Sequence, residues 1–168
     1  VFFKNLRKAQ TTQVSLENYF YPLDSLRNWN FLYGEKGFIQ YQFVIPKKNG
    51  IQILKKILDI INEHDQTPFL AVLKMLGPKN NNYLSFPIEG YTLALDFKVS
   101  SDLLKLITAL DKVITLNGGK IYLTKDAIMS KEIFRKCYPK WNEFEQVRRK
   151  YKAIGKFTSH QSLRLGLE

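Results

Sequence analysis

The hydrophobic pattern is sharpest between Gly37 and Pro46, where apolar and polar positions alternate with a period of two. The positions on one side of this segment are all apolar, namely Ile39, Tyr41, Phe43 and Ile45. Gln40 and Gln42 fall on the opposite side, because successive side chains of a strand point to opposite faces of a sheet. The segment therefore predicts a strand with one buried face and one polar face.

The rest of the first 125 residues predicts three further strands and two amphipathic helices. We expect strands at 69–76 and 91–99 and a last strand from Lys120, in which Ile121 and Leu123 alternate with Tyr122 and Thr124. Asn49 is the expected N-cap of the first helix, and Ser100 or Ser101 that of the second. The apolar stripe of the first helix comprises Ile53, Leu54, Ile57, Leu58, Ile60 and Ile61, and that of the second Leu103, Leu104, Leu106, Ile107, Leu110, Val113 and Ile114.

The order strand, helix, strand, strand, helix, strand is typical of the α+β ferredoxin-like, or split βαβ, arrangement. It predicts an antiparallel sheet with both helices on one face. Residues 130–138 and 141–151 predict two more helices, and we expect the tail 157–167 to be irregular, so the sheet carries a C-terminal helical extension. A short irregular helix is also expected between Pro22 and Gly34.

The open face of the predicted sheet is polar. Its central positions are Gln40, Gln42, Thr92, Ala94 and Asp96. Lys74 lies in an otherwise apolar strand, where a lysine lowers stability unless its ammonium reaches water, an anion or a cavity. Lys125 follows the last strand, and the ends of strands commonly carry functional residues. The pattern thus indicates a wet, partly cationic surface.

The composition permits one domain with a substantial core, since 45% of the 168 residues are hydrophobic. The net charge of +11 favours an anionic partner such as a phosphorylated substrate, a phospholipid surface or a nucleic acid. The single cysteine, Cys137, excludes an internal disulfide and a multi-cysteine metal site, and we predict no metal. The sequence contains neither a signal peptide nor an apolar run of membrane-spanning length. Its start at Val1 suggests a piece of a longer chain.

Several motifs together resemble the C-terminal part of the decaprenylphosphoryl-ribose oxidase family, which are FAD-linked oxidoreductases of the vanillyl-alcohol-oxidase type. The matching stretches, in the family's order, are residues 37–46, 69–74, 84–87, 118–126, 138–139 and 157–159, followed by Arg164-Leu165. The resemblance implies an upstream FAD-binding domain. It also implies that residues 1–119 are the second half of the substrate-binding domain, whereas residues 120–168 pack on the FAD-binding domain.

The family oxidises a secondary hydroxyl of a lipid-phosphate-linked pentose and passes the hydride to FAD. This step begins an epimerisation that a separate NADH-dependent reductase completes. The resemblance therefore implies a lipid-linked sugar phosphate as substrate, a reductase as possible partner, and peripheral contact with the cytoplasmic or periplasmic face of the inner membrane, where cell wall precursors are made. By the same resemblance, the isolated fragment is expected to be inactive.

The resemblance assigns roles to the polar positions that strand alternation had already set apart. Gln40, Gln42 and Lys74 match substrate-pocket residues, Tyr122 matches a cofactor-side tyrosine, and Lys125 matches a catalytic lysine near the flavin. Thr92 and Ala94 also match pocket positions, where mycobacterial members carry an asparagine and a cysteine. That cysteine matters to covalent inhibitors rather than to turnover, so Ala94 leaves oxidation possible.

Three other functions remain open from the residues. Oxidases of another polyol or of a sugar lactone share this region. A nucleic-acid-binding module is a second alternative, but Thr92, Ala94 and Asp96 do not provide the basic and aromatic side chains on which bases stack, so we predict no nucleic-acid partner. A non-catalytic basic domain at a membrane surface is the third, although no amphipathic basic helix stands out.

Overall fold

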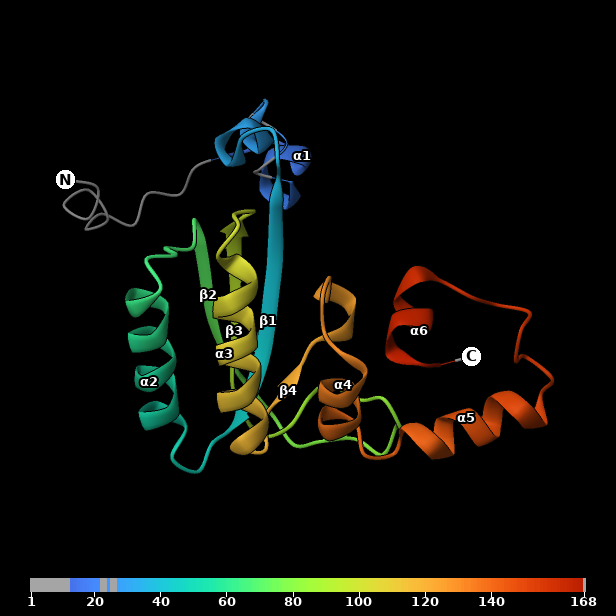
Figure 1. Cartoon of the computed structure of the whole chain (residues 1–168). Coiled ribbons are helices and arrows are strands. Elements are labelled where there is room, and N and C mark those ends of the chain that lie inside the picture. The colour runs from blue at the N-terminus through green and yellow to red at the C-terminus, as the bar shows by residue number, and fades with distance from the viewer. Residues whose placement is uncertain (1–12, 22–23, 25–26, 168) are drawn as a thin grey trace.

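The computed structural model describes residues 13–21, 24 and 27–167, and an antiparallel four-stranded sheet with helices on one face lies at its centre (Figure 1). The strands are β1 (Phe38–Pro46), β2 (Leu70–Leu76), β3 (Gly90–Lys98) and β4 (Lys120–Ile121). They lie in the order β2-β3-β1-β4, and each neighbouring pair is antiparallel. The predicted α+β class, the antiparallel sheet and the order of its elements are confirmed.

Two long helices, α2 (Gly50–Glu63) and α3 (Leu103–Leu116), cover the sheet, and α4 (Lys131–Cys137), α5 (Trp141–Lys150) and α6 (His160–Leu165) form the C-terminal extension (Figure 1). A short helix α1 (Leu16–Phe20) and a 3-10 helix η3 (Trp29–Tyr33) precede β1. The start of the helix predicted between Pro22 and Gly34 falls partly outside the described residues. Its described end is η3, which stops at Gly34 as expected.

The central strands bury the apolar side that their alternation predicted. On the helix-covered face, the side chains of Tyr41, Phe43, Ile45, Leu93, Leu95 and Phe97 are at most 6% exposed. They pack against Ile57 and Ile61 of α2 and against Leu106 and Leu110 of α3 in one continuous core. Leu58 and Leu104, which were predicted to be buried, are 49% and 61% exposed because each lies at the margin of its helix's apolar stripe.

The position of the first predicted helix cap is confirmed, and the second predicted cap is wrong. Asn49 precedes α2, but it adopts a left-handed conformation with φ of 57° and its side chain makes no cap hydrogen bond. Asp102, rather than Ser100 or Ser101, precedes α3. The Ser100 hydroxyl donates instead to Oε1 of Gln66, at 2.9 Å. The Ser100 hydroxyl, which local sequence predicts at the helix cap, is therefore used in a tertiary hydrogen bond instead.

The fourth strand is shorter than its alternation predicted. It ends at Ile121, and Leu123–Lys125 forms a 3-10 turn, η4. The last ladder bond runs from the Tyr122 amide to the carbonyl of Gln42, at 2.8 Å. The carbonyl of Leu123 accepts from Nε2 of Gln161, at 2.6 Å, so its partner lies in α6 rather than in the sheet.

The C-terminal tail was expected to be irregular, and this prediction is wrong for α6. Ser159 caps α6 through a reciprocal pair of hydrogen bonds with Ser162. Leu165 and Leu167 are 2% and 7% exposed and belong to the same core as the sheet. The tail therefore packs on this chain's own α4 and β4 region. Within the described part of the chain, no helix is long and apolar enough to cross a membrane.

Candidate functional site

The register of the strands places most of the predicted site residues on the open face of the sheet. Gln40 lies opposite Asp96, Gln42 lies opposite Ala94, and Lys74 lies opposite Thr92. Because directly paired residues of antiparallel strands point to the same face, these side chains share one surface. Tyr122 joins them, since its amide pairs with the carbonyl of Gln42.

Gln40 is held by a buried carboxylate that sequence reasoning placed on this face without giving it a role. Nε2 of Gln40 donates to Oδ1 of Asp96 at 3.0 Å, and the Tyr33 hydroxyl donates to Oδ2 at 3.4 Å. Asp96 is 5% exposed. Because the amide nitrogen is committed to Asp96, the Oε1 atom of Gln40 is the one left to accept a hydrogen bond.

Gln42 is oriented in a similar way. Its Nε2 donates to Oγ1 of Thr92 at 3.0 Å, and Oγ1 of Thr92 donates to the carbonyl of Phe43 at 2.8 Å. Thr92 is only 1% exposed, so its hydroxyl lies beneath the surface and supports Gln42. Ala94 is half-buried opposite Gln42 and adds no polar atom. The face thus presents two glutamine carbonyl oxygens of defined orientation.

The two predicted lysines lie on opposite sides of this face. Lys74 is exposed on the edge strand β2, so its ammonium reaches water, as its position in an apolar strand required. Lys125 is half-buried in η4, one turn beyond Tyr122, and its amide donates to the Tyr122 carbonyl at 3.1 Å. Among the hydrogen bonds and ion pairs of the described residues, neither ammonium has a partner.

Aromatic side chains bound the polar face at both ends. At one end Tyr33 of η3 stacks on Phe38, with ring centroids 4.2 Å apart. At the other end the ring of Phe86, from the loop between β2 and β3, packs 4.5 Å from that of Tyr122. Nζ of Lys120 donates to the Ser85 carbonyl at 2.7 Å and ties this loop to β4. Aromatic side chains thus flank the polar face at both of its ends.

The polar face offers both acceptors and donors of hydrogen bonds. Carbonyl oxygens of fixed orientation accept from hydroxyl groups, and ammonium groups donate to hydroxyl or phosphate oxygens. The described residues hold no cluster of three or more His, Cys, Asp or Glu side chains that could bind a metal. A half-buried tyrosine and a half-buried lysine, Tyr122 and Lys125, lie at the β4 edge of this face.

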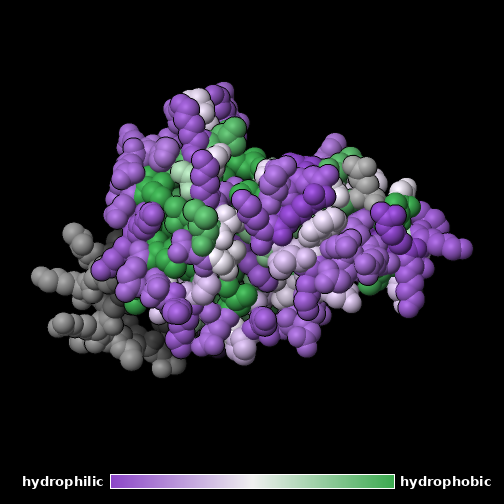
Figure 2. Space-filling model, turned by 60° about the horizontal axis from the view of Figure 1, so that its bottom comes forward, coloured by the Kyte–Doolittle hydropathy of each residue, from purple (hydrophilic) through white to green (hydrophobic). Residues whose placement is uncertain are grey.

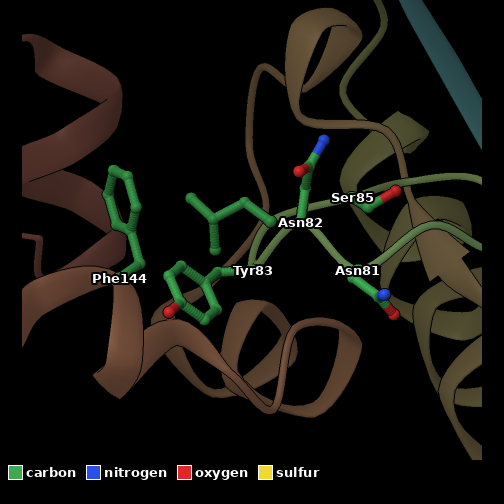
Figure 3. Close-up of a pocket in the computed structure, with 6 residues that line it drawn as sticks. Asn81, Asn82, Tyr83, Ser85 and Phe144 are labelled. Carbon is green, nitrogen blue, oxygen red and sulfur yellow. The ribbon is translucent and has the colours of Figure 1, made fainter. Parts of the chain in front are cut away.

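A hollow lies beside the loop between β2 and β3. It is lined by Asn81, Asn82, Tyr83, Leu84, Ser85 and Phe144, and Figure 3 shows Phe144 of α5 across from Tyr83 of the loop. None of the predicted site residues lines it. The hollow lies between this loop and α5 of the C-terminal extension.

Sequence reasoning missed the groups that hold the site residues in place. Tyr33 and Asp96 support Gln40, and Asp126, Gln161 and Arg164 surround η4. Alternation did place Asp96 on the open face, and Arg164 lies in one of the matching motifs. The pairing of Asp126 with Arg164 joins residues 38 positions apart, so no local pattern reveals it.

Comparison with known proteins adds independent findings. The D-arabinono-1,4-lactone oxidase family matches residues 35–165 of the chain. Decaprenylphosphoryl-β-D-ribose oxidase of Mycolicibacterium smegmatis is 36% identical over 164 residues, which cover 96% of this chain and 35% of that protein. An uncharacterised protein from the mprA 5′ region of Streptomyces coelicolor is 31% identical over 98 residues, covering 58% of the chain and 27% of that protein.

The chain thus spans about a third of the length of the first of these relatives. The family match extends from the turn before β1 to the end of α6, so it includes the polar face, η4 and, apart from Tyr33, the residues that support them. On this evidence the chain belongs to the D-arabinono-1,4-lactone oxidase family.

Proposed function

We propose that the chain is the C-terminal part of an FAD-dependent oxidase that removes a hydride from a secondary hydroxyl of a polyprenyl-phosphate-linked pentose. The observation that carries the proposal is the shared face of Gln40, Gln42, Lys74 and Tyr122, with Lys125 one turn beyond. The relative from Mycolicibacterium smegmatis, whose name specifies such a substrate, supports the sugar class.

The two glutamines position the sugar. Asp96 and Thr92 fix their amide nitrogens, so the two Oε1 atoms accept from sugar hydroxyls without first reorienting. Pre-set acceptors lower the entropy lost when the reacting carbon is brought into place. Lys74 at the outer edge donates to phosphate or sugar oxygens, where its exposed ammonium makes a charge-assisted hydrogen bond.

Lys125 acts on the reacting hydroxyl. Loss of a hydride from a carbinol carbon requires the hydroxyl proton to pass to solvent water, and a nearby ammonium stabilises the negative charge that develops on the oxygen. FAD, when bound, accepts the hydride. Tyr122 packs at the cofactor side, where its contact with Phe86 fixes the ring.

The C-terminal extension offers a surface for an FAD-binding domain. Tyr151, Phe157 and Leu163 are 73%, 77% and 49% exposed. Phe157 also lines an apolar hollow together with Leu84, Leu123, Phe144 and three residues of α6, namely Gln161, Ser162 and Leu165. We therefore propose that residues 120–168 face that domain, although Leu165 joins the core of residues 1–119. It follows that the chain by itself neither turns over nor holds FAD firmly.

The remaining partners follow from the substrate. The net charge of +11 favours anionic lipid, which is consistent with peripheral binding at the inner membrane, on its cytoplasmic or periplasmic face. An NADH-dependent reductase would consume the keto product. A second candidate function, oxidation of a sugar lactone such as D-arabinono-1,4-lactone, is favoured by the name of the matching family.

The test is to replace Lys125 with Ala in the full-length protein and to assay oxidation of decaprenylphosphoryl-β-D-ribose and of D-arabinono-1,4-lactone. We expect the first substrate to be preferred and Lys125→Ala to lower kcat by about 10²-fold or more with FAD content unchanged. The matched control is Lys112→Ala, an exposed lysine on α3. Normal turnover by Lys125→Ala removes this lysine from catalysis, and preference for the lactone selects the second function.

A further inference from the structure

The carboxylate of Asp126, directly after Lys125, is the centre of a dense hydrogen-bond network. Its Oδ1 accepts from the amides of Ile128 and Met129 at 3.0 and 2.7 Å. Its Oδ2 accepts from Nη2 of Arg164 at 2.9 Å and from Nε2 of Gln161 at 3.3 Å. The side chain of Asp126 is only 3% exposed, so this charge is shielded from water.

The same two residues of α6 also bind backbone on either side of Lys125. Nε2 of Gln161 donates to the carbonyl of Leu123 at 2.6 Å, and Nη1 of Arg164 donates to the carbonyl of Met129. The backbone is therefore held two residues before Lys125 and again after it. None of these bonds engages the Lys125 ammonium itself, so the network fixes the backbone and leaves the amine available.

We propose that Gln161 and Arg164 are positioning residues that hold η4 so that Lys125 meets the reacting hydroxyl, an inference that rests on the proposed function. A three-residue 3-10 turn has poor hydrogen-bond geometry and little stability of its own. Two side chains from a distant helix supply the rigidity that the turn lacks. Reaction rates fall steeply when a catalytic group moves by about 1 Å, so such support acts on kcat.

The anchoring of α6 makes it a suitable support. Leu165 is 2% exposed within the core, and Leu167 is 7% exposed. The capping box of Ser159 and Ser162 fixes the start of the helix. Gln161 and Arg164 are three residues apart on α6, so they lie on the same side of it and reach the turn together.

The cleanest test is Gln161→Met in the full-length FAD-bound protein, because methionine keeps the length of the side chain and cannot donate to the Leu123 carbonyl. Arg164→Met and the conservative Arg164→Lys accompany it, and Arg149→Met on α5, where the arginine is exposed, is the control. The measurements are kcat and KM with decaprenylphosphoryl-β-D-ribose, bound FAD, and hydrogen exchange of the amides of residues 123–129.

We expect Gln161→Met to lower kcat about 10-fold, with KM and FAD content within about threefold of the parent protein. Exchange of the Ile128 and Met129 amides should accelerate about 10-fold in Arg164→Met, and Arg164→Lys should restore part of kcat because it keeps the charge beside Asp126. Combined with Lys125→Ala, Gln161→Met should cause no further loss, since both changes act on one group.

Unchanged kcat in Gln161→Met overturns the proposal, and so does a further loss of rate in the double variant. Equal exchange rates in the parent protein and Arg164→Met also overturn it, because η4 would then be stable without the hydrogen bonds from Arg164. If the parent protein oxidises neither substrate, the proposed function fails, whereas the exchange measurement still decides whether α6 holds η4.

Discussion

The two edges of the sheet are built in opposite ways. At one edge, β2 has seven residues, none of them buried, and its Leu70, Leu73 and Met75 side chains are 50%, 58% and 65% exposed. Figure 2 shows apolar surface on the left of the molecule, the side on which Figure 1 places α2 and β2. At the other edge, β4 has two residues, and Ile121 is 1% exposed beneath α3 and α4.

The comparison shows that the length of a strand does not indicate how much of the structure depends on it. β2 pairs with β3 along its whole length, yet none of its own side chains is buried. β4 is short, but α4 packs against it and η4, which carries the predicted catalytic lysine, follows it directly. The site is therefore supported by tertiary contacts at the short edge, so changes there should have large effects and changes at β2 small ones.

The largest effect is expected from Phe134→Ala in α4. Phe134 is 0% exposed and packs 5.5 Å from the ring of Tyr138, so its removal leaves a cavity and should lower the free energy of unfolding by about 3–5 kcal/mol. Leu73→Ala at the β2 edge should change it by about 0.5 kcal/mol or less. Urea unfolding of both variants measures the difference, and similar losses would show that the edges are equally important.

A pair of glycines gives a second comparison. A Cβ atom on Gly119 would lie 2.7 Å from the Val44 carbonyl oxygen and 2.9 Å from that of Ile114. Because backbone atoms cannot move aside easily, Gly119→Ala should lower the free energy of unfolding by about 2 kcal/mol. A Cβ atom on Gly77, after β2, would meet no atom within 4 Å, so Gly77→Ala is the control with an effect of about 0.5 kcal/mol or less. Urea unfolding compares the two variants, and equal losses would show that the close approach at Gly119 carries no penalty.

The pH dependence of stability tests whether the buried carboxyl of Asp111, on α3, has a raised pKa. The Tyr41 hydroxyl donates to Oδ1 of Asp111 on α3 at 2.6 Å, and burial raises the pKa of Asp111 to about 6 from 3.8. The folded chain then binds more protons than the unfolded chain between these values, so this group lowers stability as the pH rises from about 4 to about 6.

Asp111→Asn should remove that part of the pH dependence while its Oδ1 still accepts from Tyr41. We expect the variant to gain about 1–3 kcal/mol relative to the parent chain between pH 4 and pH 7. Urea unfolding at each pH measures the gain. An equal difference between variant and parent at both pH values would show that Asp111 does not titrate in this range.

The smallest effect on the free energy of unfolding is expected from Met75→Lys in the edge strand β2. The side chain is 65% exposed, so the free energy of unfolding should change by about 0.5 kcal/mol or less. A lysine on an edge strand discourages pairing with another chain, so any concentration-dependent light scattering should decrease. Increased scattering would show that the apolar side chains of β2 do not promote association.

The central strands β1 and β3 could be predicted from sequence because each has a strand on both sides. The alternation of apolar and polar residues then decides which of their side chains are buried. Phe43 and Leu95, predicted on the helix side, are 0% exposed. The edges could not be predicted in this way. The apolar residues of β2 resemble a buried strand, and only the sheet order shows that no further strand covers it among the described residues.

The candidate site also has a part that local sequence predicts and a part that depends on tertiary contacts. Alternation and the family motifs predicted Gln40, Gln42, Lys74 and Tyr122 as site residues, and the register brings these four to one face. Neither the alternation nor the motifs could predict where β4 ends. The Leu123 carbonyl accepts its hydrogen bond from Gln161, which lies 38 positions later in the sequence. Likewise, Ser100 is a good capping residue by type, but its bond to Gln66 depends on the packing of α2 against α3.

The thiol of Cys137, at the end of α4, offers a direct readout of this half of the molecule. It is the only cysteine in the sequence, it is 1% exposed, and burial raises its pKa to about 11. A maleimide or disulfide reagent should therefore react with the chain only when α4 detaches from the sheet. The rate of that labelling reports local opening beside the turn that carries Lys125, without any added probe or engineered site.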